Sequence, residues 1–249
     1  MSKTITDISI TLPKSWDELS QKQLRYLYTM IALGLSVEEV KTYCLFHWSK
    51  IVVLHRYGDN GYMCKLKKKR FVMTADQVTA AIAFLEWIKQ LPMFPVRLEK
   101  IGRHRAVPAD MQGVPLETFI ICDNLYQGYL STQKEEMLDE MAAHLYGTSR
   151  LNDAERINVF YWFASVKAML ALEFKNFFKP MQNDSSNMFE SNKTQYEILK
   201  EAVNAQIRAL TKGDVTKEKE VLAMDTWRAL TELDAQAREY EQLKKQHHL

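Results

Sequence analysis

Glycine and proline are scarce in this sequence, with 8 and 6 residues among 249. Many-turned β sandwiches need both residues at their turns, whereas the abundant Met, Leu, Ala, Glu and Lys favour helices. Apolar residues make up 47% of the chain, which is enough to build a globular core. We therefore expect a fold that is rich in α-helix.

Cysteine is also rare, and the three present, Cys44, Cys64 and Cys122, are widely spaced in apolar surroundings. An odd number in such positions argues against a disulfide framework and favours buried thiols in a reducing compartment. Cys44 and His47 have metal-ligand side chains at close spacing, but a tetrahedral zinc site needs about two more ligands. No matching pair is visible, so we predict no metal site.

The common motifs of enzyme chemistry are missing as well. The sequence has no G-x-S-x-G nucleophile elbow and neither of the glycine-rich phosphate loops, G-x-x-x-x-G-K-[ST] and G-x-G-x-x-G. Adjacent acids such as Glu38 and Glu39 lie on predicted helices as solvated charges, whereas acid catalysis needs a carboxylate held in a cleft. We predict a non-enzymatic protein with no catalytic residue and no cofactor.

Long uncharged apolar runs are also lacking. The most apolar segment, residues 157–178, is interrupted by Lys167, Glu173 and Lys175, and the N-terminus has no apolar core of a secretory signal. We expect a cytoplasmic protein that does not bind membranes.

Apolar residues at helical spacing fill most of the chain. Three pairs have the capping-box spacing that marks a helix start: Ser15 and Glu18, Ser36 and Glu39, and Thr132 and Glu135. A further apolar helix is predicted to begin at Thr74 or Asp76 and to end before Pro92. Three helices between residues 116 and 178 are expected to pack together as a bundle.

Residues 51–73 have a different pattern. The stretches IVVLHRY, YMCKL and RFVM are rich in β-forming residues, and the first two are separated by the turn sequence GDNG. This predicts a β-hairpin or a small three-stranded meander. The fold class is therefore mainly α with a small β element (α+β).

The polar segment 179–193 is the best candidate for a linker, and it divides a domain of residues 1–178 from residues 194–249. Two amphipathic helices in the latter predict a C-terminal helical hairpin. Its Trp227, Leu230 and Tyr240 are candidates for binding a partner protein. Alternatively, the same apolar stripe packs on residues 160–178 of its own chain.

Charge is unevenly distributed along the chain, and a basic run lies in its first half. Residues 1–110 hold 17 Lys and Arg against 10 Asp and Glu, and the remainder holds 16 against 21. Such asymmetry suits an acidic partner or self-association. The run itself comprises Lys65, Lys67, Lys68, Lys69 and Arg70. We interpret it as a solvated turn or edge that prevents aggregation; nucleic-acid binding is the alternative, although no reading helix, zinc finger or RNP motif accompanies it.

Three stretches carry a resemblance to known proteins: LPKSWDELSQKQLRYLY, TFIICDNLYQGYLSTQKEEMLDEMAAHLY and NAQIRALTKGDVTKEKEVLAMDTWRALTELDAQAREYEQLK. With them the chain resembles proteins from the tail-morphogenesis regions of prophages and related mobile elements of gut anaerobes. The resemblance covers most of the chain and is diffuse. It implies a chaperone-like tail-assembly protein that binds another protein, such as a tail component, in the host cytoplasm or in the particle.

Overall fold

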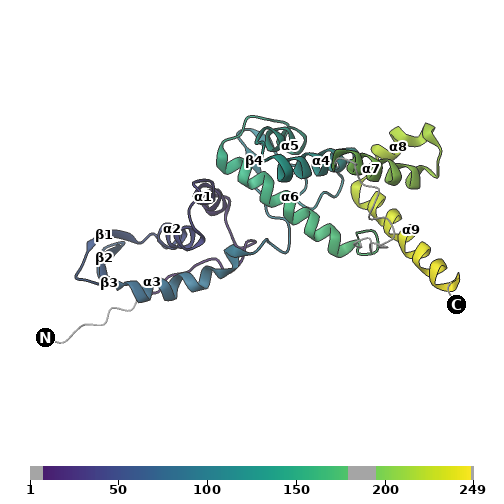
Figure 1. Cartoon of the computed structure of the whole chain (residues 1–249). Helices are drawn as coiled ribbons and strands as arrows, with labels where there is room; N and C mark the ends of the chain where they lie inside the picture. The colour runs from purple at the N-terminus through teal and green to yellow at the C-terminus, as the bar shows by residue number, and fades with distance from the viewer. Residues whose placement is uncertain (1–7, 179–194, 248–249) are drawn as a thin grey trace. The chain divides into compact units, whose positions relative to one another are not determined.

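The computed structural model describes residues 8–178 and 195–247, and these are mainly helical with a small β part, which confirms the predicted fold class (Figure 1). The chain divides into two compact units. Unit 1 consists of Met1–Pro92, Val96–Glu99 and Asn152–Tyr161; unit 2 consists of Met93–Pro95, Lys100–Leu151 and Trp162–Leu249.

Two helices that contact one another, α1 (Gln21–Ala32) and α2 (Val37–Ser49), open unit 1. The predicted capping box before α2 is confirmed. The Ser36 hydroxyl accepts the Glu39 N–H at 3.3 Å, and the Glu39 carboxylate accepts the Ser36 N–H at 2.9 Å. This pair satisfies two backbone N–H groups that the start of a helix leaves without partners.

The predicted helix start at Ser15 is wrong. Helix α1 is capped by Ser20, whose partner in the capping box is Gln23. The carboxylate of Glu18 instead accepts the N–H of Lys14 at 2.8 Å. The capping box that directly precedes the apolar run therefore sets the start of the helix, and Glu18 instead stabilises the turn of residues 14–18.

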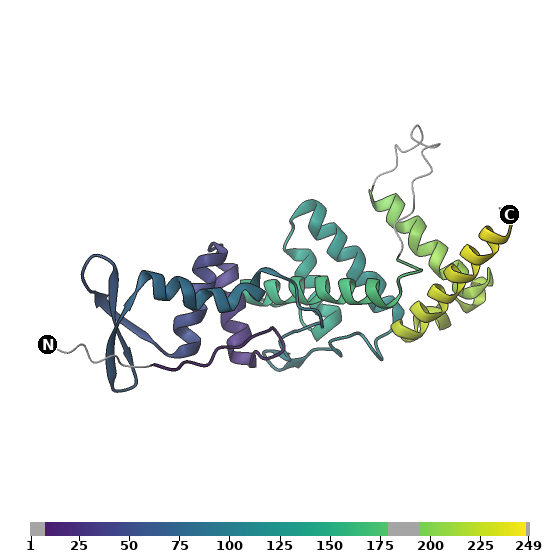
Figure 2. The same cartoon turned by 90° about the horizontal axis from the view of Figure 1, so that it is seen from below.

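Three strands, β1 (Val52–Arg56), β2 (Gly61–Leu66) and β3 (Lys69–Thr74), confirm the β meander predicted at residues 51–73. They are antiparallel in the order β1-β2-β3, so β1 and β3 are the two edges of the sheet. Figure 2 shows the strands as a twisted ribbon next to α3.

The helix predicted after the meander begins at Thr74 but is not uniform. Thr74 caps α3 (Ala75–Ile82), which continues into the 3-10 helix η1 (Ala83–Lys89) with a kink at Leu85. Both pack on the core of unit 1, where Trp16 contacts the ring of Trp87 at 5.6 Å between centroids. The fully buried members of this core are Leu24, Leu27, Tyr28, Cys44, Leu45, Cys64 and Leu85.

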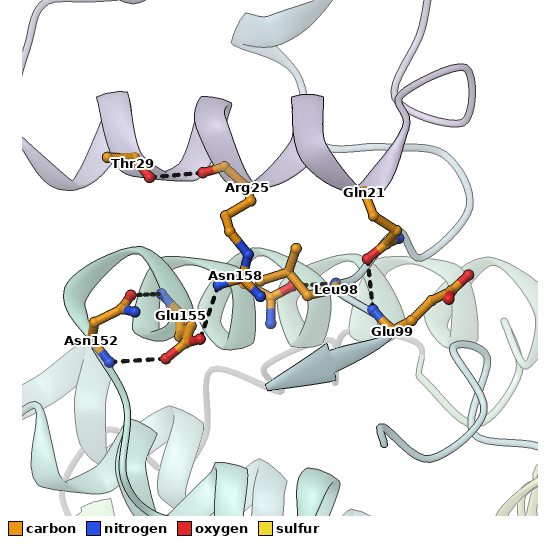
Figure 3. Close-up of polar contacts among 8 residues, drawn as sticks. All are labelled: Gln21, Arg25, Thr29, Leu98, Glu99, Asn152, Glu155 and Asn158. Atoms are coloured by element: carbon orange, nitrogen blue, oxygen red, sulfur yellow. Dashed lines mark hydrogen bonds and ion pairs between the residues drawn. The ribbon is translucent and has the colours of Figure 1, made fainter. Parts of the chain in front are cut away.

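Polar contacts join three separate chain segments in unit 1 (Figure 3). Asn152 caps α6 (Asp153–Glu173) by accepting the Glu155 N–H, and the Glu155 carboxylate accepts the Asn152 N–H in return. The same carboxylate pairs with Arg25 of α1 at 2.9 Å. The carbonyl oxygen of the fully buried Asn158 accepts the Leu98 N–H at 2.8 Å.

The three helices predicted between residues 116 and 178 are confirmed as α4 (Leu116–Thr132), α5 (Glu136–Tyr146) and α6. Helices α4 and α5 contact each other in unit 2, which also contains the short strands β4 (Lys100–Ile101) and β5 (His104–Arg105).

The capping box predicted at Thr132 and Glu135 is wrong. The Thr132 hydroxyl donates to the carbonyl of Gly128 at 2.8 Å, and Glu135 precedes α5 without a side-chain cap. Thr132 is still the last residue of α4, so its hydroxyl bonds back to the preceding turn of that helix.

Unit 2 ends with α7 (Gln195–Thr211), η3 (Val215–Lys217), α8 (Glu218–Leu222) and α9 (Thr226–His247). Helices α7 and α9 contact each other, which agrees with the predicted C-terminal hairpin (Figure 2). The sequence predicted only these two helices, and the structure adds the short turns of η3 and α8 between them.

The predicted linker 179–193 lies outside the described residues, and residues 162–178 belong to the same compact unit as α7 and α9. The proposed boundary between residues 1–178 and 194–249 therefore stays a prediction. The segments 96–99 and 152–161 belong to unit 1 because of contacts between residues that lie far apart in the sequence.

Candidate protein-interaction surfaces

The cysteines lie in the interior of the protein. Burial raises the pKa of Cys44 and of Cys122 to about 12, so both thiols are protonated at neutral pH and are weak nucleophiles. The ring of His47 stacks on that of Tyr26, with 3.6 Å between centroids. In residues 8–178 and 195–247, no group of three or more His, Cys, Asp or Glu side chains is arranged to hold a metal ion.

The basic run lies at the turn between β2 and β3. Lys67 and Lys68 form a two-residue turn, and Lys67 has a left-handed backbone with φ 55°. Lys65 lies on the central strand, and Lys69 and Arg70 begin the edge strand β3. All five cations are exposed, and among the described residues none of them forms an ion pair with a carboxylate.

The first half of α9 is firmly held within unit 2. The Thr226 N–H and hydroxyl both donate to the Val114 carbonyl, at 2.8 and 2.7 Å. The Asp225 carboxylate accepts the Gly113 N–H at 2.6 Å. The N–H of Leu116 also donates to the carbonyl of Met224. Several hydrogen bonds therefore join the start of α9 to the segment before α4.

One carboxylate holds α9 further along. Asp234 accepts the backbone N–H groups of Asn176 and Phe177 and the side-chain amide of Asn176, at 2.8 to 3.0 Å. Desolvation opposes the charged form, but these hydrogen bonds outweigh it and hold the pKa of Asp234 below its ordinary value.

The structure separates the three predicted partner-binding residues. Leu230 is only 1% exposed, and the half-buried Trp227 donates its indole N–H to the Asp110 carbonyl at 2.6 Å and contacts Phe174. Tyr240 is 67% exposed, and Leu243, one turn later, is 55% exposed. Of the three predicted residues, Tyr240 is therefore the one whose side chain faces solvent.

A groove that the sequence did not reveal lies on unit 1. It has a volume of ≈ 640 Å³ and is lined by residues 10–14 together with Ala80, Ala81 and Phe84, which is 74% exposed. The position of Phe84 in the sequence could have indicated this groove. The core face of the predicted helix runs through Ile82 and Leu85, and Phe84 lies off that face although it is apolar.

None of the helices in the described part of the chain has both the length and the apolar character needed to cross a bilayer. Comparisons with protein-family models, with curated proteins and with solved structures find no match. The resemblance to prophage tail-morphogenesis proteins therefore stays a prediction from the sequence.

The anchor of α9 gives a pH-dependent prediction. Because the pKa of Asp234 is lowered in the folded protein, its stabilising effect is complete above the unfolded value of about 3.9 and is lost as pH falls through the folded value. We expect Asp234→Asn to lower the free energy of unfolding by about 1 kcal/mol at pH 7. Denaturant unfolding followed by tryptophan fluorescence should show this difference shrinking below pH 4.

Glu239→Gln is the matched control, because Glu239 lies on the exposed side of the same helix. The free energy of unfolding of this variant should remain within about 0.5 kcal/mol of that of the parent protein, both at pH 7 and below pH 4. The assigned role of the Asp234 carboxylate would be contradicted if both variants lowered the free energy of unfolding equally. It would also be contradicted if the effect of Asp234→Asn on that free energy were the same at low pH as at pH 7.

Proposed function

We propose that this protein is a non-enzymatic, chaperone-like factor that binds another protein during the assembly of a phage or prophage tail. The observation that carries the proposal is the division of α9 into an anchored and an exposed half. Ala229, Leu230 and Leu233 are buried, whereas Tyr240 and Leu243 project into solvent from a continuous helix.

An apolar pair one turn apart on an exposed helix is a usual way to bind a helical partner. Side chains at positions i and i+3 lie on the same face, where they fit a groove or a second helix. Tyr240 is suited to such a contact because its ring buries a large apolar area while its hydroxyl keeps a hydrogen bond. The anchored half lowers the entropic cost of binding, because the helix is already formed.

The assignment to tail assembly rests on the sequence resemblance, and the exposed helix supports its protein-binding part. The partner would be another tail protein in the host cytoplasm, with binding there or in the finished particle. A second copy of this chain is the alternative partner, since the exposed pair could also contact its own counterpart.

The exposed pair can be tested in the native host after prophage induction. The double substitution Tyr240→Glu and Leu243→Glu places two charges in the proposed apolar contact, where desolvation is costly. We expect the number of tailed particles, counted by electron microscopy, to fall at least tenfold while the level of the protein itself is unchanged.

Gln242→Glu with Gln246→Glu is the control, because it adds two charges to exposed positions of the same part of α9. Tail numbers should be normal in this strain. Normal tails in the Tyr240 and Leu243 variant, or an equal defect in the control, would refute the proposed role of this surface.

The second candidate function is nucleic-acid binding, and the unpaired cations of the basic run favour it. Binding through phosphates releases counterions and so weakens steeply with salt. We expect only weak binding of single- and double-stranded DNA and RNA at low salt, and its disappearance at physiological salt. Submicromolar binding that persists there, and that is lost when Lys67, Lys68 and Lys69 are changed to Gln, would promote this candidate over tail assembly.

A further inference from the structure

The edge strand β1 has an unusual surface. All five of its residues are exposed, with Val52 at 56%, Val53 at 42% and Leu54 at 41%. Edge strands expose backbone N–H and C=O groups that can pair with another chain, and proteins usually protect them with lysine, proline or a cover. The other edge, β3, begins with Lys69 and Arg70, whereas β1 begins with three apolar residues.

Backbone groups on the outer side of β1 are available for pairing. The N–H of Tyr57 donates to Gly61 at 2.8 Å, so the alternation of an antiparallel ladder directs the backbone of Arg56 away from β2. In the described part of the chain no strand pairs with this side. A bulge at Leu54 leaves that residue out of the register and exposed at the same edge.

The charge of the sheet selects the partner. Residues 52–74 contain six Lys and Arg and one acid, Asp59. On the open face, one cross-strand row consists of Val52, Lys65 and Arg70. This face thus presents an apolar side chain at the edge with two cationic side chains next to it, which complements a strand that carries acidic and apolar residues.

We propose that β1 binds an extended acidic segment of another protein by strand addition. The incoming strand hydrogen-bonds to the outer side of Val52–Arg56, with acidic side chains toward the face of Lys65 and Arg70 and apolar side chains beside Val53 and Leu54. A second copy of this chain is disfavoured as the partner, because edge-to-edge pairing would bring two sheets of strongly positive charge together.

This site goes beyond the proposed function, since β1 belongs to unit 1 and α9 to unit 2. A nucleic acid would use the cations but would need neither the backbone of the edge nor the apolar side chains. The two ligand classes therefore differ in which amide groups they protect.

The test uses the full-length chain, labelled with ²H and ¹⁵N, and a capped hexapeptide of alternating glutamate and valine. We expect saturable NMR shifts in β1 and at least tenfold slower hydrogen exchange of the Arg56 amide at saturation. The corresponding peptide of lysine and valine should bind at least tenfold more weakly. Lys67, Lys68 and Lys69 changed together to Gln should weaken the binding but keep the protection of Arg56.

Lys65→Glu should weaken the binding of the acidic peptide at least tenfold, because Lys65 lies on the face that the acidic side chains would contact. Arg103→Glu, which likewise replaces a cation by an acid at an exposed site, but in unit 2, should not weaken it. Cα chemical shifts typical of strands in β1, β2 and β3 would show that the sheet of the Lys65 variant is intact. No binding, or shifts confined to residues 67–70, would overturn the proposal. So would tighter binding of a single-stranded oligonucleotide at physiological salt, or a dimer in sedimentation that pairs through β1.

Discussion

The hydrogen bonds at the start of α6 hold unit 1 together, because they join chain segments that lie far apart in the sequence. Glu155 closes the cap with Asn152 and at the same time pairs with Arg25, so one carboxylate fixes both the helix start and its contact with α1. Asn158 is completely buried, and its carbonyl satisfies the N–H of Leu98. Leaving such a buried group without a partner costs about 1 to 3 kcal/mol.

The surfaces proposed for binding are elements that are only partly used by the core. In the sheet, Cys64 and Met73 face the core of unit 1, while the edge strand β1 remains exposed. In α9, burial stops after Leu233, and the helix continues for several turns with apolar side chains in solvent. Each element is therefore ordered by its own unit and still offers apolar contacts to another molecule.

Much of the fold could be predicted from local signals in the sequence. The cap at Ser36, the β pattern of residues 51–73 and the helices after Leu116 all depend on neighbouring residues, and the structure confirms them. Ser15 misled the prediction, because Ser20 and Gln23 form a second pair with capping-box spacing that lies closer to the apolar residues of α1.

Features that depend on distant contacts could not be predicted. The apolar stripe of α9 looks uniform in the sequence, but Trp227 and Leu230 are covered and Tyr240 is not, because Asp110, Phe174 and Asn176 reach only the first half of the helix. Likewise, the pattern of β1 predicts a strand without showing that all five of its side chains are exposed in the described part of the chain. Burial is set by what packs against an element, and this information is not local.

Site-specific photo-crosslinking in the native host tests the central claim, that this protein acts through protein partners, most directly. A crosslinker would be placed at Leu243 of α9, at Leu54 of β1 and at Lys68 of the basic turn, with exposed Glu239 as the control position. The account predicts adducts with tail proteins from Leu243, protein adducts from Leu54, and neither from Glu239. Nucleic-acid adducts from Lys68, without protein adducts from the other two positions, would contradict it.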